Sequence, residues 1–187
     1  MLLGNGVFAF SQWLQISLIS KYSSIDILGL FTLALSIISP IFMFSGLQLR
    51  ILIITDVDSQ THFNTFFNLR IWTSVLSLIV IAIIGFFLPN YALWPYLILL
   101  SFQKILEGIS ELFNSKQQQY EKIEILALSL FLKGAAIIFS IGLGLIILKS
   151  LFIGLLLILF FYLIIIYFYD YKNYKKEYHQ KINFKIE

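Results

Sequence analysis

The sequence predicts an all-α, polytopic membrane protein, and its composition and its long apolar runs carry that prediction. Hydrophobic residues make up 59% of the 187 residues, and charged residues only 12%. The mean hydropathy is +0.90. Several apolar runs reach the length of about 20 residues that a helix needs to cross a bilayer, and short polar segments separate them. These features exclude an ordinary soluble domain, and the lack of cysteine excludes a disulfide framework and a cysteine metal site.

Six apolar segments predict six transmembrane helices. Their expected ranges are 2–20, 27–54, 69–88, 92–113, 125–148 and 151–168. We expect one six-helix lobe over 1–170, followed by a lysine-rich tail over 171–187. An even number of spans places both termini on one side of the membrane. Most of the basic residues outside the spans lie on that side, which predicts cytoplasmic termini.

Two features stand out around the second segment. Pro40 lies near its middle and predicts a kink, which is either a packing feature or a hinge for alternating access. The polar stretch 55–70 contains three phenylalanines and predicts a short interfacial helix before the third span. Asp56 and Asp58 form a DxD pair there, but no nucleotide-binding domain accompanies it, which disfavours a sugar-nucleotide enzyme.

Amide side chains mark one face of the first segment. Asn5, Gln12 and Gln15 are spaced by seven and three residues and share a helical face. Amides in a bilayer favour protein partners over lipid tails, so this face should point into the protein. The stripe is either a set of interhelical hydrogen bonds or, at Gln12, part of a substrate path.

Charged residues at membrane depth are the strongest functional signal. Lys104, Glu107 and Glu111 recur at helical spacing on the fourth segment, and Lys133 lies inside the fifth. A charge at this depth costs at least about 2–3 kcal/mol and normally faces a partner or a wet cavity. Because the two helices are antiparallel neighbours, we expect Glu107 to bridge Lys104 and Lys133. The cluster is either a structural ion-pair network or the lining of a charged lumen.

Catalysis has little support in the sequence. There is no glycine-rich phosphate loop, no metal-ligand spacing and no Ser/His/Asp set, and the two histidines, His62 and His179, lie far apart. We therefore expect neither an enzyme nor a cofactor or metal.

The order of these features resembles the Wzx-type O-antigen and capsular polysaccharide flippases of the multidrug/oligosaccharidyl-lipid/polysaccharide exporter superfamily. The matching stretches are GLQLRILIITD (46–56), FNLR (67–70), QKILEGISE (103–111), QQQYEKIEILALSLFLKG (117–134) and YDY (169–171). The positions that fit the family pattern are Arg50, Asp56, Lys104, Glu107, Ser110, Glu121, Ser129, Lys133 and Gly134. Asp56, Arg70 and Glu121 would form a motif on the cytoplasmic loops. Glu111 stands where the pattern has Asp, a change that keeps the charge.

This resemblance implies one lobe of a MATE-like, two-lobed transporter in the bacterial cytoplasmic (inner) membrane. The chain would be the amino-terminal lobe of a truncated or split protein. Its substrate would be a polyprenyl-diphosphate-linked oligosaccharide, flipped during O-antigen, lipopolysaccharide or other surface polysaccharide synthesis. Lys104, Lys133 and Arg50 would attract the diphosphate or an acidic sugar, and Glu107 could carry a proton.

Partners other than this substrate would be membrane lipids, a second six-helix lobe and a polysaccharide polymerase, with no nucleic acid. Two alternative functions stay open. One is a non-transporting membrane scaffold within a glycan-assembly complex. The other is a drug or cation exporter of the same superfamily.

Overall fold

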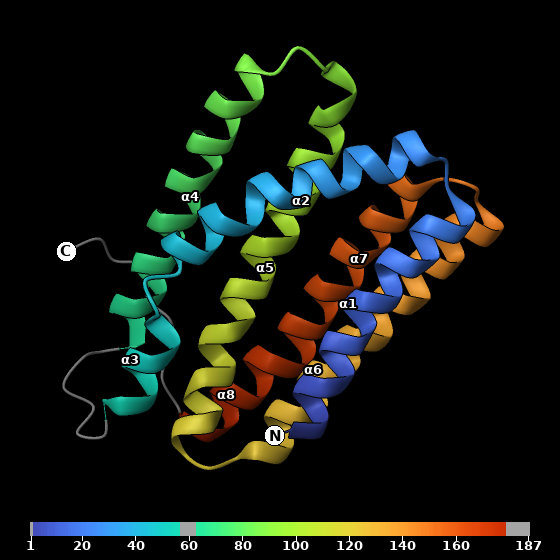
Figure 1. The fold of residues 1–187 in the computed structure, drawn as a ribbon. Coiled ribbons are helices and arrows are strands. Elements are labelled where there is room, and N and C mark those ends of the chain that lie inside the picture. Colours follow the sequence, from blue (N-terminus) through green and yellow to red (C-terminus); the bar gives the residue numbers. More distant parts are fainter. Residues whose placement is uncertain (1, 57–62, 179–187) are drawn as a thin grey trace.

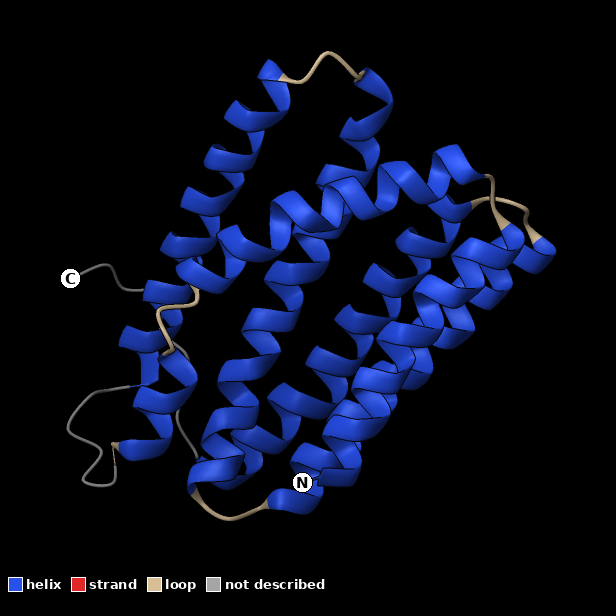
Figure 2. Ribbon diagram, viewed as in Figure 1, coloured by secondary structure: helices blue, strands red, loops and turns tan. Residues whose placement is uncertain are grey.

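The computed structural model describes residues 2–56 and 63–178, and the regular elements within these ranges are all helices (Figure 2). The α-helices are α1 (Leu2–Tyr22), α2 (Ile25–Ser45), α3 (Leu49–Thr55), α4 (Phe63–Phe87), α5 (Trp94–Gln119), α6 (Ile123–Gly142), α7 (Leu151–Ile165) and α8 (Lys172–Tyr178). A 3-10 helix (Tyr91–Leu93) precedes α5, and π-helical turns (Leu143–Ile147 and Ile166–Tyr171) extend α6 and α7. Asp58, His62 and residues 179–187 of the predicted tail, with His179, lie outside the described residues.

The fold class is confirmed as an all-α, multi-pass membrane protein. Four helical stretches of the described chain are long and apolar enough to cross a membrane: Ile25–Thr55, Phe63–Phe87, Ile123–Ile147 and Leu151–Lys176. α1 and α5 have 21 and 26 residues, and at about 1.5 Å per residue they are long enough as well. Both helices are more polar than the four stretches just named, so the assignment of α1 and α5 as further membrane spans stays a prediction. The helices α4, α5, α6 and α7 run back and forth between two ends of the molecule (Figure 1).

The helix predicted over 27–54 is broken, and the break does not lie at Pro40. α2 runs through Pro40 and ends at Ser45. Leu47 and Gln48 then adopt left-handed backbone angles, with φ of 46° and 50°, and the chain turns sharply into α3 (Figure 1). Leucine and glutamine carry no sequence signal for this conformation, which usually selects glycine or asparagine. The role of Pro40 as a hinge stays a prediction.

The prediction of a short interfacial helix before residue 69 was wrong, because the phenylalanines of that stretch belong to α4. Phe63 and Phe67 are buried on one face of α4. The Phe63 ring lies 4.6 Å from that of Tyr174 in α8 and 5.9 Å from that of Phe113 in α5, measured between centroids. This aromatic cluster ties α4, α5 and α8 together at one end of the molecule, so α4 begins six residues earlier than expected.

The fourth and sixth predicted helices are longer than expected. α5 continues to Gln119 and leaves only a short turn before α6 begins at Ile123, where a loop over 114–124 was expected. The polar residues Asn114, Ser115 and Gln117 are buried in α5 and do not form a solvated loop. The helical backbone after Leu151 likewise continues to Tyr178, through the first part of the predicted tail.

α5 occupies the centre of the bundle and packs against α2, α3, α4, α6 and α7. α1 lies along α6, and a Cβ added to Gly4 would fall 2.9 Å from the Cα of Ala127. α6 and α7 approach still more closely, since a Cβ on Gly144 would fall 2.5 Å from the Cα of Gly154. This packing partly buries Lys104 and Glu107 of α5, whose side chains are 26% and 16% exposed.

Candidate functional site

A cavity of about 370 Å³ opens among residues of α1 to α6. Six charged side chains contribute to its lining: Arg50, Arg70, Lys104, Lys133, Glu107 and Glu111. The lining holds four basic and two acidic side chains, and Asp170, which lies outside the lining, pairs with Lys133, so four basic and three acidic groups leave a formal excess of one positive charge. Between apolar helices such an excess attracts anions more strongly than it would in open water.

α5 supplies three of these charges because of its helical spacing. Lys104, Glu107 and Glu111 lie three and four residues apart and therefore share one face of the helix. The sequence predicted this stripe, and the structure places all three residues on the cavity. One to two turns earlier, the same face of α5 carries Leu97 and Leu100, which are buried in the main core.

Lys104 and Glu107 form a direct ion pair. The Lys104 Nζ lies 2.7 Å from the Glu107 Oε2, and the two side chains are 26% and 16% exposed. Gln103 Nε2 donates to the other carboxylate oxygen at 3.1 Å, and the Tyr162 hydroxyl donates to it at 3.5 Å. Glu107 is thus held by three donors, and Lys104 keeps part of its surface toward the cavity.

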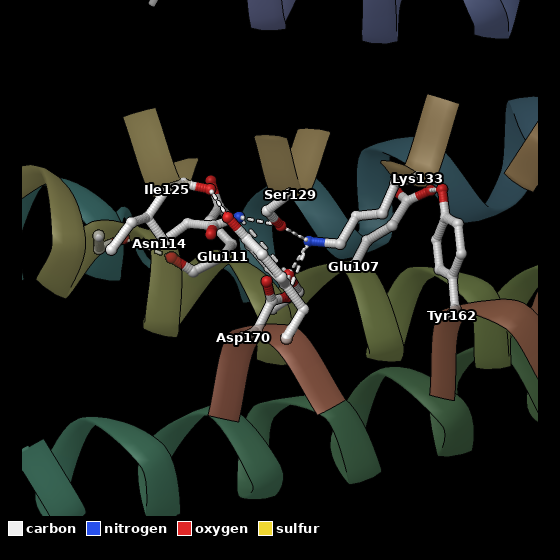
Figure 3. Close-up of polar contacts among 11 residues, drawn as sticks. Glu107, Glu111, Asn114, Ile125, Ser129, Lys133, Tyr162 and Asp170 are labelled. Atoms are coloured by element: carbon white, nitrogen blue, oxygen red, sulfur yellow. Dashed lines mark hydrogen bonds and ion pairs between the residues drawn. The ribbon is translucent and has the colours of Figure 1, made fainter. Parts of the chain in front are cut away.

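Lys133 forms a second ion pair, and this one is almost fully buried (Figure 3). Its Nζ lies 2.9 Å from the Asp170 Oδ2, and the side chains are 3% and 1% exposed. Lys133 also donates to the hydroxyls of Ser129, at 2.7 Å, and Ser110. The Ser110 hydroxyl in turn donates to Asp170, and Asn114 approaches both serines at 3.5 Å. The pair joins α6 to the π-helical turn after α7, with α5 between them.

Arg50 and Glu111 form a looser and more exposed pair. The Arg50 Nη1 lies 3.9 Å from the Glu111 Oε1, and the side chains are 36% and 46% exposed. The Arg50 Nη2 also donates to the Gln118 Oε1 at 2.9 Å, so α3 is held against α5. A pair this exposed contributes about 0–1 kcal/mol to stability, which leaves both charges available to a ligand.

Arg70 lies in the cavity wall and not in a cytoplasmic loop, which corrects the sequence-based assignment. It belongs to the second turn of α4 and is only 6% exposed. The assignment was wrong because it started α4 at residue 69, whereas the helix begins at Phe63. Its guanidinium lies against Gly108 of α5 and close to Gly46 at the end of α2.

The structure brings together most of the predicted cluster but changes its pairing. Arg50, Lys104, Glu107, Glu111 and Lys133 all line the cavity. Glu107 was expected to bridge the two lysines. Of the two lysines, it contacts only Lys104, and its charge reaches Lys133 only at longer range. The partner of Lys133 is Asp170, the last residue of the predicted lobe, which the sequence did not connect with the charged cluster. One feature of the sequence could have indicated this pairing. Asp170 is the single acidic residue of the aromatic run YFYDY, and no turn residue separates that run from the apolar helix α7.

The remaining predicted residues lie elsewhere. Gln12 lines a separate hollow of about 170 Å³, together with Gln15, Gln103 and Lys104. Lys104 lines both cavities, so this hollow is a neighbour of the first.

Asp56 and Glu121 lie at chain turns beyond the lining of the cavity. Asp56 caps α3, and its carbonyl oxygen accepts a hydrogen bond from Gln119 Nε2 at 2.5 Å. Glu121 has a φ of 59° in the turn between α5 and α6. In the part of the chain that the structure describes, no group of three or more His, Asp or Glu residues could hold a metal ion.

The fold and the cavity define a multi-pass, all-helical membrane protein with a positively charged interior. The chain is similar to the capsular polysaccharide biosynthesis protein CapF of Staphylococcus aureus, with 28% identity over 130 residues. The match covers 70% of this chain and 32% of CapF, so the chain spans about a third of that relative. No family model matches the chain, and no solved structure matches it.

Proposed function

We propose that this chain takes part in flipping a polyprenyl-diphosphate-linked oligosaccharide across the bacterial cytoplasmic membrane. The observation that carries the proposal is the cavity of about 370 Å³, lined by four basic and two acidic side chains. A diphosphate carries the charge that such a cavity favours. The similarity to a protein named for capsular polysaccharide biosynthesis supports a role in the same process.

The ion pairs suggest how binding and release could alternate. Lys104 and Arg50 remain partly exposed, at 26% and 36%, and would meet the anionic head group first. Protonation of Glu107 would remove its attraction for Lys104 and free the ammonium for the substrate. Binding could thereby be linked to a proton. Apart from this proton transfer, no covalent bond of the substrate is made or broken in this scheme, so it involves no catalysis and no cofactor.

A non-transporting scaffold in a polysaccharide-assembly complex is the second candidate, and one observation favours it. Three of the four cations on the cavity, Arg50, Lys104 and Lys133, already have a carboxylate partner in the chain. Such pairs could serve only to fix the register of the helices. A cation exporter is less well supported, since a cavity with an excess of basic side chains repels cations.

Export of surface polysaccharide distinguishes these candidates. In the intact protein, we expect Lys104→Ala and Glu107→Gln each to lower export by tenfold or more, since a charged hydrogen bond contributes about 1.5–3 kcal/mol. Protein levels in the membrane should stay normal. Lys116→Ala is a matched control, because Lys116 lies on the same helix but outside the cavity lining. Normal export by both cluster variants would remove the cavity from the transport path and favour the scaffold.

A further inference from the structure

Arg70 differs from the other basic residues of the cavity. Arg50, Lys104 and Lys133 each have a carboxylate oxygen within 4 Å. Among the described residues, Arg70 has no such partner, although it is only 6% exposed. Its Nε is buried and has no hydrogen-bond partner in that part of the chain. The charge of Glu111 reaches Arg70 only at longer range, and a buried guanidinium without a direct counterion is unfavourable, so a ligand anion would supply the missing contact.

Two glycines from different helices make room for the Arg70 side chain. A Cβ on Gly108 of α5 would overlap the guanidinium, and a Cβ on Gly46 at the end of α2 would fall 3.2 Å from its Nη1. Neither glycine has a positive φ, so backbone conformation does not require them. A glycine that lets two helices pack closely faces the backbone of the other helix, as Gly144 faces Gly154. Gly108 instead faces the charged side chain of Arg70. These two glycines, which we call the cradle, therefore leave room for the guanidinium in the cavity wall.

We propose that Arg70, in the cradle formed by Gly46 and Gly108, is a binding subsite for a diphosphate oxyanion. This subsite rests on the proposed function and names the group of the substrate that the cavity holds. A guanidinium presents its N–H donors in a planar fork that matches two phosphate oxygens at once. Lys133 cannot do the same, because Asp170 and two serine hydroxyls already occupy its ammonium. Lys104 and Arg50 line the same cavity and can contact the remaining oxygens.

The test measures anion binding by the intact, purified protein in detergent. Inorganic pyrophosphate and farnesyl diphosphate are titrated by calorimetry against wild type, Arg70→Gln, Gly108→Ala and Gly29→Ala. A Cβ on Gly108 displaces the guanidinium and leaves every charge in place, whereas a Cβ on Gly29 meets nothing within 4 Å. We expect Arg70→Gln and Gly108→Ala to weaken binding by tenfold or more, and Gly29→Ala to bind as wild type does.

The two probes separate the possible sources of the anion. Binding of both through Arg70 means that a free diphosphate suffices, and binding of farnesyl diphosphate alone means that the lipid chain is also needed. Either result supports the subsite. Failure of wild type to bind either probe, or unchanged binding by Arg70→Gln or by Gly108→Ala, would overturn it. Size-exclusion profiles and thermal unfolding confirm folding, and if Arg70→Gln is unfolded the comparison of Gly108→Ala with Gly29→Ala decides alone.

The result is independent of the export assay. Normal export by Lys104→Ala and Glu107→Gln would refute the proposed function but leave Arg70-dependent diphosphate binding standing. Unchanged diphosphate binding by Arg70→Gln would refute the subsite and leave the flippase proposal standing.

Discussion

Asp170→Asn should strongly destabilise the protein, because it leaves Lys133 charged and buried without a carboxylate. At the observed separation of 2.9 Å, two unit charges attract by about 6 kcal/mol at an effective dielectric constant of about 20. Desolvation offsets much of this attraction, but removing one partner of a buried pair still costs about 3–5 kcal/mol. Since Ser110 and Ser129 keep their hydrogen bonds to Lys133, we expect a loss of about 3 kcal/mol in the free energy of unfolding.

The assay is a double-mutant cycle on the intact protein, unfolded by SDS titration in mixed micelles. Lys133→Met and Asp170→Leu are measured singly and together. The double variant replaces both charges by apolar groups of similar size, so its stability should lie within about 1 kcal/mol of wild type or above it. The coupling energy between the two sites should therefore exceed about 2 kcal/mol. Glu111→Gln serves as the control, because the exposed pair with Arg50 should contribute less than about 1 kcal/mol.

Two results would refute this reasoning. One is a loss below about 1 kcal/mol from Asp170→Asn, which would mean that Lys133 is hydrated or paired with another residue. The other is a double variant as unstable as the sum of the single variants, which would mean that the two residues act independently.

Two further predictions concern access to the cavity and helix packing. The chain has no cysteine, so single cysteines can be introduced without a background. Lys104→Cys and Glu107→Cys should react with a small charged thiol reagent, whereas Ile137→Cys, at a fully buried core position, should not. Protection at both 104 and 107 would argue against a water-accessible cavity. Gly144→Ala should lower stability by about 1–3 kcal/mol through overpacking, since its Cβ would fall 2.5 Å from the α7 backbone. Gly142→Ala, whose Cβ meets nothing within 4 Å, should be neutral in the same unfolding assay, and equal effects of the two would contradict the close packing of α6 on α7.

The helices could be predicted because the bilayer imposes a length and a composition on each span. Apolar runs of sufficient length give the number and type of the elements, and the structure places helices in all six predicted ranges. The predicted helix boundaries are wrong where the backbone conformation does not follow from the residue types at those positions. Leu47 and Gln48 adopt left-handed angles although neither residue type favours them. Asn114 and Gln117 look like loop residues in the sequence, and only the packing of α5 against its neighbours explains their burial in a helix.

The site was predictable within one helix and not between helices. Helical periodicity alone places Lys104, Glu107 and Glu111 on one face, so the stripe follows from the sequence. The choice of Asp170 as the partner of Lys133 depends on how α7 and its π-helical extension dock beside α6, which periodicity does not determine. The position of Arg70 depends in the same way on where α4 begins and on two glycines of other helices.

The exposure of the ion pairs separates structural from ligand-binding charges within one cluster. Lys133 and Asp170 are almost fully buried, and the Lys133 ammonium also donates to the hydroxyls of Ser110 and Ser129, so this pair fixes the docking of α6 and α7 around α5. The Lys104–Glu107 pair and Arg50 are partly exposed to the cavity. A ligand anion can compete for them at a modest loss, whereas competition for Lys133 would leave Asp170 buried and unpaired. Export should therefore tolerate the stable Lys133→Met/Asp170→Leu variant but not Lys104→Ala. The reverse outcome would place substrate binding at the buried pair and not in the open part of the cavity.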